Sequence, residues 1–342
     1  MPSKSHGVHL VGSVPLADAG SVFRMASAKL GDRLKRLPDG ETGVRSKWVH
    51  WQLRVFEAMD VFDSEVVDTG YIRRAQFRLK PGVRPKDISF PALGYAEAAR
   101  ASYAEFARLR ERGEIAGHLK FLTCLPTPLA PVTSFVFPES RAAVEPLYQE
   151  RLFAELDEII AAVPREHLAI QWDTAYEFAI LEGVTPSHFT DPQAAIFERL
   201  VRYGDRVPAA VELGYHLCYG DSGHRHFKDP EDTGKLVLVA SHLARHVARP
   251  LHWVHVPVPR ARSDEAYFAP LSSLERRPET ELYLGLIHFT DGIEGARRRI
   301  DAARRHVRDF GVATECGLGR RPPETIPALL DLHAEVSDLA SG

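Results

Sequence analysis

The chain has 342 residues, of which 44% are hydrophobic and 26% charged, and its 43 basic residues nearly balance 46 acidic ones. These fractions are typical of globular proteins and exclude a disordered tail or a fibre. Because no long run of one charge occurs, we expect neither nucleic acid nor a membrane as a partner. The three cysteines are far apart, and no signal sequence or membrane-spanning stretch is recognisable, so we expect a cytoplasmic protein with reduced thiols.

Short apolar runs alternate along the chain with longer stretches of helical periodicity. The runs predicted as strands are 8–13, 34–38, 118–123, 167–173, 209–216, 251–256, 282–288 and 312–316. Helices are predicted at 92–113, 139–163 and 292–309. Eight strands with helices between them predict an α/β fold, a single (β/α)8 TIM barrel spanning residues 1–342. An open doubly wound sheet is the alternative.

Residues 44–91 form a long insertion between the second and third predicted strands. The segment opens with a Trp-rich stretch at 47–56 and continues with a predicted hairpin at 65–80. An insertion of this length usually carries a function, so we expect either a lid over the site or an oligomer contact.

Polar and titratable residues follow most of the predicted strands. In a barrel of parallel strands these positions share one face, where the active site lies. The residues are Ser13, Glu41, Asp173, His216, Cys218, His288, Glu315 and Cys316. Their concentration at one edge is the strongest functional signal in the sequence.

His216 and Cys218 suggest a metal site. Two residues apart on an extended chain, their side chains point to the same face. Cys316 ends the last predicted strand, within reach across the mouth of a closed barrel. An imidazole and two thiolates are ligands that Zn²⁺ prefers, so the sequence predicts a zinc site. The alternative is that both cysteines are small buried hydrophobic residues and His216 a core histidine.

Two further groups lie near the predicted mouth. Arg260 and Arg262 follow the sixth strand, and guanidinium groups suit a planar anion such as a carboxylate. Exterior salt bridges are the alternative for both. Residues 224–226, which read His-Arg-His, either supply a metal ligand or form a solvated loop near the substrate.

Taken together, these motifs resemble the catalytic barrel of cobalamin-independent methionine synthase and, more broadly, the superfamily that it forms with uroporphyrinogen decarboxylase. The motifs occur in the family's order over most of the chain. Residues 11–15 look like its Gly-Ser-x-Pro turn, 39–41 like its His-Gly-Glu, 171–173 like its Gln-x-Asp, 216–219 like its zinc-binding His-x-Cys-Tyr, 287–288 like its Ile-His, and 315–318 like its Asp-Cys-Gly-Leu.

The resemblance implies a zinc-dependent methyl or alkyl transferase that acts on a thiol. His216, Cys218 and Cys316 would be the zinc ligands. Ser13, Glu41 and Asp173 would bind the substrate, with Asp173 also placed among the catalytic groups. His288 would be the general acid. The expected partners are a small-molecule substrate, such as a thiol, and a corrinoid or other methyl-donor protein.

The chain departs from the family in two places. The family's remaining zinc ligand, a glutamate, falls here near Pro257 or Pro259, which leaves His255 as the candidate replacement. The family's Asp-Glu-Pro reads Asp173-Thr174-Ala175. We therefore expect a donor or substrate different from that of methionine synthase.

Two other functions stay open from the sequence. The first is a lyase or decarboxylase on the same barrel, in which Arg260 and Arg262 would bind a small carboxylate and His288 would move protons. The second is a non-catalytic binding protein, which is a costly use for so many titratable groups.

Overall fold

The structure is a computed structural model that describes residues 6–68, 73–223 and 225–342. One sheet of seven strands forms its centre, and every neighbouring pair is parallel. In sheet order the strands are β1 (Arg36–Pro38), β4 (Lys120–Pro126), β5 (Leu168–Thr174), β6 (Glu212–Leu217), β7 (Trp253–Pro257), β8 (Glu281–Ile287) and β9 (Gly311–Thr314). Most of their residues are buried, because helices cover the outer face and side chains fill the inner one.

Segment 8–13, the first predicted strand, lies between the two edge strands of this curled sheet. Val8 forms isolated parallel bridges to Leu34, beside β1, and to Val312 in β9. The segment pairs only at isolated positions, the other being Ser13 with Gly40, so it is not the regular strand that its apolar run predicts. The edges of an open doubly wound sheet would lie apart, whereas here one segment contacts both.

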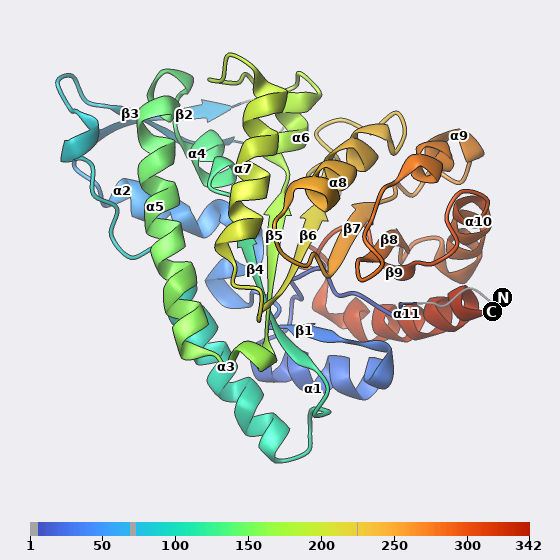
Figure 1. Cartoon of the computed structure of the whole chain (residues 1–342). Helices are drawn as coiled ribbons and strands as arrows, with labels where there is room; N and C mark the ends of the chain where they lie inside the picture. The colour runs from blue at the N-terminus through green and yellow to red at the C-terminus, as the bar shows by residue number, and fades with distance from the viewer. Residues whose placement is uncertain (1–5, 69–72, 224) are drawn as a thin grey trace.

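Helices follow the strands in alternation and lie around the sheet (Figure 1). They are α1 (Ala19–Leu30), α3 (Tyr95–Glu111), α4 (Leu129–Phe135), α5 (Pro138–Ala162), α6 (Tyr176–Leu181), α7 (Pro192–Arg206), α8 (Gly234–His246), α9 (Glu265–Phe268), α10 (Gly292–Arg304) and α11 (Ile326–Ser341). The predicted helices 92–113 and 292–309 are longer than α3 and α10, whereas 139–163 matches α5 within one residue at each end.

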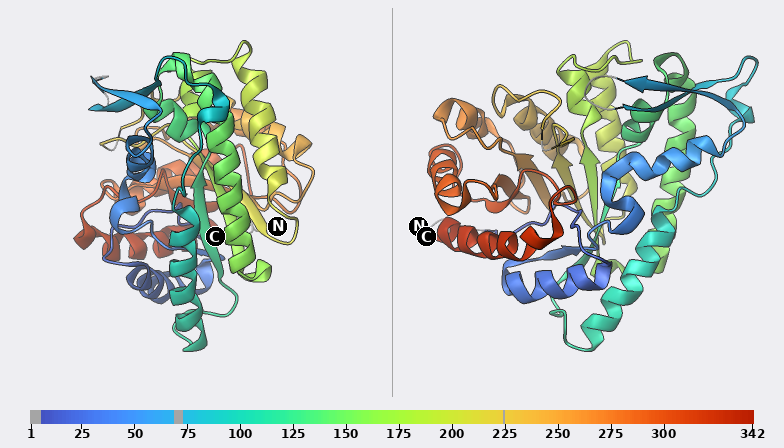
Figure 2. Two further views of the ribbon diagram at one scale, coloured as in Figure 1. Left: turned by 90° about the vertical axis from the view of Figure 1, so that its left-hand side faces the viewer. Right: turned by 180° about the vertical axis from the view of Figure 1, so that it is seen from behind.

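The first and last of these helices pack against each other at the bottom of the molecule (Figures 1 and 2). Lys29 of α1 pairs with Asp331 of α11 at 2.7 Å, and Arg33, just after α1, pairs with Asp338 at 2.8 Å. These contacts join the first and last helices on the outside of the curled sheet. Within the sheet, segment 8–13 connects the two edges in the same way.

The chain between β1 and α3 forms a separate layer above the sheet. It contains a 3-10 segment (Gly43–Gln52), α2 (Leu53–Glu57) and the antiparallel pair β2 (Phe62–Asp68) and β3 (Arg73–Leu79), whose connection at 69–72 lies outside the described residues. Phe56 is fully buried among aromatic rings, with ring centroids 5.6 Å from Phe135 and 5.9 Å from Tyr148. The inserted segment is therefore packed firmly on α4 and α5.

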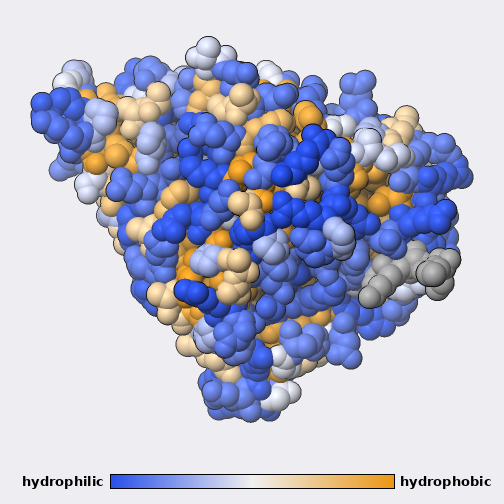
Figure 3. Space-filling view, viewed as in Figure 1, coloured by the Kyte–Doolittle hydropathy of each residue, from blue (hydrophilic) through white to orange (hydrophobic). Residues whose placement is uncertain are grey.

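The face of the molecule seen in Figure 3 is largely hydrophilic, with hydrophobic areas scattered over it. Across the part of the chain that is described, no helix combines the length and the apolar character needed to cross a membrane.

Candidate functional site

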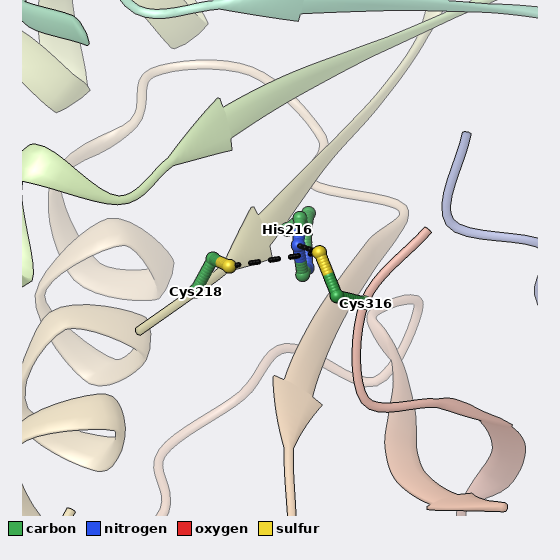
Figure 4. A group of neighbouring side chains, drawn as sticks. All are labelled: His216, Cys218 and Cys316. Atoms are coloured by element: carbon green, nitrogen blue, oxygen red, sulfur yellow. Dashed lines mark hydrogen bonds between the residues drawn. The ribbon is translucent and has the colours of Figure 1, made fainter. Parts of the chain in front are cut away.

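Three predicted metal ligands meet at one point although they are distant in sequence. His216 lies near the end of β6, Cys218 follows that strand, and Cys316 follows β9 (Figure 4). The Sγ atoms of the two cysteines are 3.8 Å apart, and Cys316 Sγ is 3.7 Å from His216 Nε2. All three ligand atoms lie within 4.8 Å of one another. Curling of the sheet produces this cluster, because β7 and β8 separate β6 from β9.

A chain of hydrogen bonds fixes which nitrogen of His216 faces the sulfurs. His255, its register partner on β7, places Nε2 3.0 Å from the Thr314 carbonyl oxygen and Nδ1 2.7 Å from His216 Nδ1. A carbonyl oxygen can only accept, so Nε2 of a neutral His255 carries the proton and its Nδ1 accepts one from His216. Burial lowers the pKa of His255 well below its usual value, which keeps the ring neutral. Nε2 is thus the nitrogen of His216 that faces the cysteines. Burial lowers the pKa of His216, but the charge of Cys218 and a bond to it raise the pKa above its usual value, so the metal-free ring favours a proton on Nε2 that a metal would displace.

His255 is therefore not available as the fourth ligand that the sequence suggested. Both of its nitrogens are hydrogen-bonded, one to His216 and one to Thr314. It supports His216 from behind, as a hydrogen-bond partner commonly does for a metal-binding histidine.

The two thiols are electrostatically unequal. A hydrogen bond between them and the nearby His216 lower the pKa of Cys218 well below its usual value, although burial opposes this. The same bond, together with burial, raises the pKa of Cys316. The backbone N–H of Gly220 also donates to Cys218 Sγ at 3.2 Å. Of the two cysteines, Cys218 is thus the one whose surroundings favour the thiolate.

Ser13 holds the loop that carries Cys316. Its carbonyl oxygen accepts from Leu318 N at 2.6 Å, and its hydroxyl accepts from Gly319 N at 3.2 Å. A Cβ at Gly317 would lie 2.3 Å from the Ser13 hydroxyl oxygen, so only glycine allows this approach. The first and last βα segments are locked together beside the sulfurs.

Two predicted substrate-binding acids, Glu41 and Asp173, line the same cavity as the thiols. Burial and the charge of Asp173 raise the pKa of Glu41 to about 8. Burial raises the pKa of Asp173 to about 7, although His216 and a bond from Gln171 lower it. Glu41 has φ of 45°, an uncommon conformation outside glycine, because the tight turn after β1 directs it inward. One buried carboxyl, of Asp173, and one half-buried carboxyl, of Glu41, form a natural site for a cationic or hydroxyl group.

Trp48, Asp221 and Arg320 complete the cavity, whose empty volume is about 510 Å³. Trp48 comes from the inserted segment, and its side chain donates to Asp173. Arg320 pairs with Asp221 at 3.0 Å. None of these three residues was predicted from the sequence, where the available signals were the Trp-rich stretch and the position of Arg320 shortly after Cys316.

The predicted general acid, His288, lies in a neighbouring cavity that shares Cys316 with the first. Its Nε2 donates to the Val258 carbonyl at 2.8 Å, and its Nδ1 is 3.9 Å from a carboxylate oxygen of Glu315. The other oxygen of Glu315 lies 2.8 Å from His226 Nε2. A bond to Glu315 raises the pKa of His226 to about 9 despite burial. His224, the other histidine of that run, lies outside the described residues.

The two predicted anion-binding arginines occupy different environments. Arg260 lines the cavity of His288 and donates to Thr290 Oγ1 at 2.9 Å. Arg262 pairs with Asp264 at 2.8 Å and lies over the ring of Tyr267, and it lines neither cavity. The exterior salt bridge that the sequence left open is thus the observed state of Arg262.

The donor set fits a zinc ion. Zinc holds sulfur at about 2.3 Å and nitrogen at about 2.0 Å, so its tetrahedral ligands lie roughly 3.5 to 3.8 Å apart. Two of the three ligand pairs, at 3.8 and 3.7 Å, agree with this spacing, and the third pair, Cys218 Sγ with His216, lies within 4.8 Å. Three protein ligands and one open position are typical of catalytic zinc sites, whereas structural sites have four protein ligands.

Comparison with solved structures finds several proteins of similar fold. The chain is similar to a B12-independent methionine synthase from Shewanella (TM-score 0.59, 15% identity, covering 99% of this chain and 97% of that one). It is also similar to a putative vitamin-B12-independent methionine synthase from Listeria monocytogenes (0.58, 13%, 99% and 98%). A methyltransferase from Methanosarcina mazei follows (0.51, 12%, 95% and 94%).

No model of a known protein family matches the chain, and no curated protein matches its sequence. At these identities the structural likeness concerns the fold. The predicted resemblance to the methionine synthase barrel is confirmed at that level.

Proposed function

We propose that the protein is a zinc-dependent methyl or alkyl transferase that acts on a thiol. The observation that carries the proposal is the convergence of His216, Cys218 and Cys316 within 4.8 Å, inside a cavity that also contains Glu41 and Asp173. The shared fold with methionine synthases and a methyltransferase supports transfer of a methyl group. The proposed substrate is a small thiol that also bears a cationic or hydroxyl group.

Bound zinc would keep a substrate thiol deprotonated at neutral pH while leaving it nucleophilic. The chain's own residues orient the metal ligands and the substrate. His216 presents Nε2 to the metal because His255 and Thr314 fix the orientation of its ring. Glu41 and Asp173 orient the polar group of the thiol substrate, and Trp48 positions Asp173 through a hydrogen bond from its side chain.

The leaving group is protonated from the neighbouring cavity in this proposal. His288 Nδ1 faces Glu315, and the two cavities meet at Cys316. Burial lowers the pKa of His288, so the nearby Glu315 carboxylate is needed to retain a proton there. Asp173 is the other catalytic candidate, since it lies beside His216 in register.

We also propose that segment 8–13 acts as the first strand of an eight-unit barrel with the inserted segment as its lid. Both edge strands contact segment 8–13, which supports the eight-unit arrangement. Ser46 and Trp48 of the inserted segment line the thiol cavity, which favours the lid over an oligomer contact.

The proposal can be tested on Co²⁺-substituted protein, because thiolate-to-cobalt charge-transfer absorption reports each bound sulfur. Adding a small aminothiol should increase this absorption, and adding the corresponding amino alcohol should not. Cys124→Ser is the matched control and should respond as the wild type does, because Cys124 is a buried thiol outside the ligand cluster. No response to any thiol, or an equal response to the alcohol, would contradict the proposal.

A lyase or decarboxylase on this barrel predicts a different result. Its turnover would survive chelation of the metal and would need no thiol acceptor. The ion pair of Arg262 with Asp264 removes one of the two guanidiniums that this alternative uses for a carboxylate.

A further inference from the structure

A larger cleft adjoins the thiol cavity on the side of the inserted segment. This insert cleft has an empty volume of about 1620 Å³ and includes Trp48, His50, Arg74, Arg141, Tyr176 and Phe227 in its lining. Five residues line both hollows, namely Trp48, Ala175, Gly220, Asp221 and Arg320. A ligand in the insert cleft can therefore reach the sulfurs past Trp48.

The walls of the insert cleft suit an apolar or aromatic body. Rings of Trp48, His50, Tyr176 and Phe227 contribute to it, together with small aliphatic side chains. Val184, also in the lining, is 45% exposed, which is high for a valine. Concave sites with mostly apolar walls and a few polar groups are typical of small-molecule binding.

The charges in the insert cleft do not cancel. Its lining includes four cations, Lys47, Arg74, Arg141 and Arg320, and one acid, Asp221, which pairs with Arg320. Within residues 6–68, 73–223 and 225–342, no carboxylate forms an ion pair with any of the other three cations. The lining therefore has an excess of positive charge beside its aromatic wall.

Arg141 shows this excess most clearly. Its side chain is buried, with a relative exposure of 4%, yet its partners are three backbone carbonyls, those of Thr133, Val136 and Pro186. A guanidinium has five N–H donors, so its donor capacity is not used up. Burial lowers the pKa of Arg141 to about 10, and the charge of Arg74 adds to this, because Tyr176 and Glu139 offset only part of the loss of hydration.

Two buried polar atoms in the same wall also have no hydrogen-bond partner among the described residues. They are Nε of Arg74, on β3, and Oγ1 of Thr133, on α4. Thr133 is 1% exposed. Buried polar groups are normally satisfied, so polar atoms without a partner, beside a guanidinium that forms no ion pair with a carboxylate, indicate a ligand with acceptor atoms.

We propose that the insert cleft binds the alkyl donor and that this donor is a small organic anion with an apolar or aromatic body. Its acidic group lies at Arg74 and Arg141, and its apolar body lies along Trp48, Tyr176 and Phe227. The alkyl end then reaches the thiol cavity at Trp48.

The leaving group stays in the insert cleft, which among the described residues shares only Asp221 with the cavity of His288. In this arrangement Asp173, beside Trp48 in the thiol cavity, therefore protonates it in place of His288. This inference rests on the proposed function for the identity of the ligand as donor, and it replaces a methyl-donor protein by a free small molecule.

The test uses two fluorescent probes that share one aromatic body. Anilinonaphthalene sulfonate is an anion, and N-phenylnaphthylamine is its uncharged counterpart. The purified full chain should bind the sulfonate saturably with one site per chain and at least tenfold more tightly than the amine. Arg74→Gln should weaken sulfonate binding about tenfold and leave amine binding unchanged.

Arg78→Gln is the matched control, because Arg78 lies on the same strand, β3, but outside the insert cleft. It should change neither affinity. Val184→Glu, which places a carboxylate in the lining, should also weaken binding of the sulfonate and not of the amine. Far-UV circular dichroism and thermal unfolding of each variant identify any that fail to fold.

Three results would overturn the inference: no saturable sulfonate binding, equal affinity for the two probes, or equal losses in the Arg74 and Arg78 variants. The Cys218→Ser variant separates this test from that of the proposed function. It should lose the metal and still bind the sulfonate. Zinc without sulfonate binding would refute the insert cleft alone, and sulfonate binding without zinc would refute the transferase alone.

Discussion

At the scale of single residues, the orientation of His216 depends on a neighbour that does not touch the metal position. His255→Phe keeps an aromatic ring but removes the nitrogen that accepts from His216 Nδ1. We expect zinc affinity to fall about 10- to 100-fold, as is usual when the hydrogen-bond partner of a ligand is lost. Competition with a chromophoric chelator measures this. Unchanged zinc affinity would show that the hydrogen bond between His216 and His255 does not orient His216.

Glu41 makes the stability of the metal-free protein dependent on pH. Its folded pKa of about 8 lies above the unfolded value of 4.5, so its contribution is fully present below pH 4.5 and is lost as the pH rises through 8. Glu41→Gln does not ionise. The variant should therefore exceed the wild type in unfolding free energy by roughly 1 to 3 kcal/mol at about pH 9, and match it at about pH 4.

Urea unfolding at the two pH values gives the comparison. Glu139→Gln is the control, because Glu139 is exposed on the outside of α5. A Glu41 variant that follows the wild type at both pH values would mean that this carboxyl is not held neutral in the fold.

The residues that the sequence identified share one property. His216 and Cys218 are two positions apart at the end of a strand, and Asp173 and His288 also end strands, so local spacing and the parallel fold place them. Trp48 could not be identified in this way. Trp48 lies on the inserted segment, and its own φ of 52° is a backbone conformation that no local sequence pattern predicts. From there its side chain reaches Asp173.

At the scale of elements, the inserted segment depends on its aromatic cluster. Phe56 is fully buried and contacts rings from β3, α4 and α5. Phe56→Ala should lower the unfolding free energy by about 3 to 5 kcal/mol, measured by urea denaturation. Val66→Ala in the same hairpin is the control, because Val66 is 61% exposed and should change stability by less than about 0.5 kcal/mol. Equal effects would show that the cluster does not hold the segment.

The bounds of the strands were predicted well where burial is uniform along the strand, and less well at the two edges of the sheet and in the inserted segment. The β5 and β8 runs differ from their predictions by one residue at each end. Segment 8–13 has an equally apolar run but forms only isolated bridges, because its pairing depends on the two edge strands and not on its own residues. The hairpin was expected at 65–80, and its first strand in fact begins at Phe62.

At the scale of the whole molecule, the curling of the sheet produces the site. His216 and Cys316 are 100 residues apart, and their side chains meet only because the strands between them curve. Their positions at the ends of two predicted strands of a barrel allowed this meeting to be predicted, and the order of motifs in the family resemblance implied the same ligands. Neither the insert cleft nor the role of His255 could be predicted, since both require the three-dimensional placement of side chains that are remote in sequence.

The central claim is that two thiols and one imidazole together hold one zinc ion. Elemental analysis of protein purified without added metal tests it most directly, with the Cys218→Ser, Cys316→Ser and Cys124→Ser variants prepared in parallel. We expect about one zinc per chain in the wild type and in Cys124→Ser, and a large loss of zinc in the Cys218 and Cys316 variants. Wild-type protein that contains no zinc and also fails to take it up, or equal zinc in all four proteins, would show that these three residues do not hold the ion.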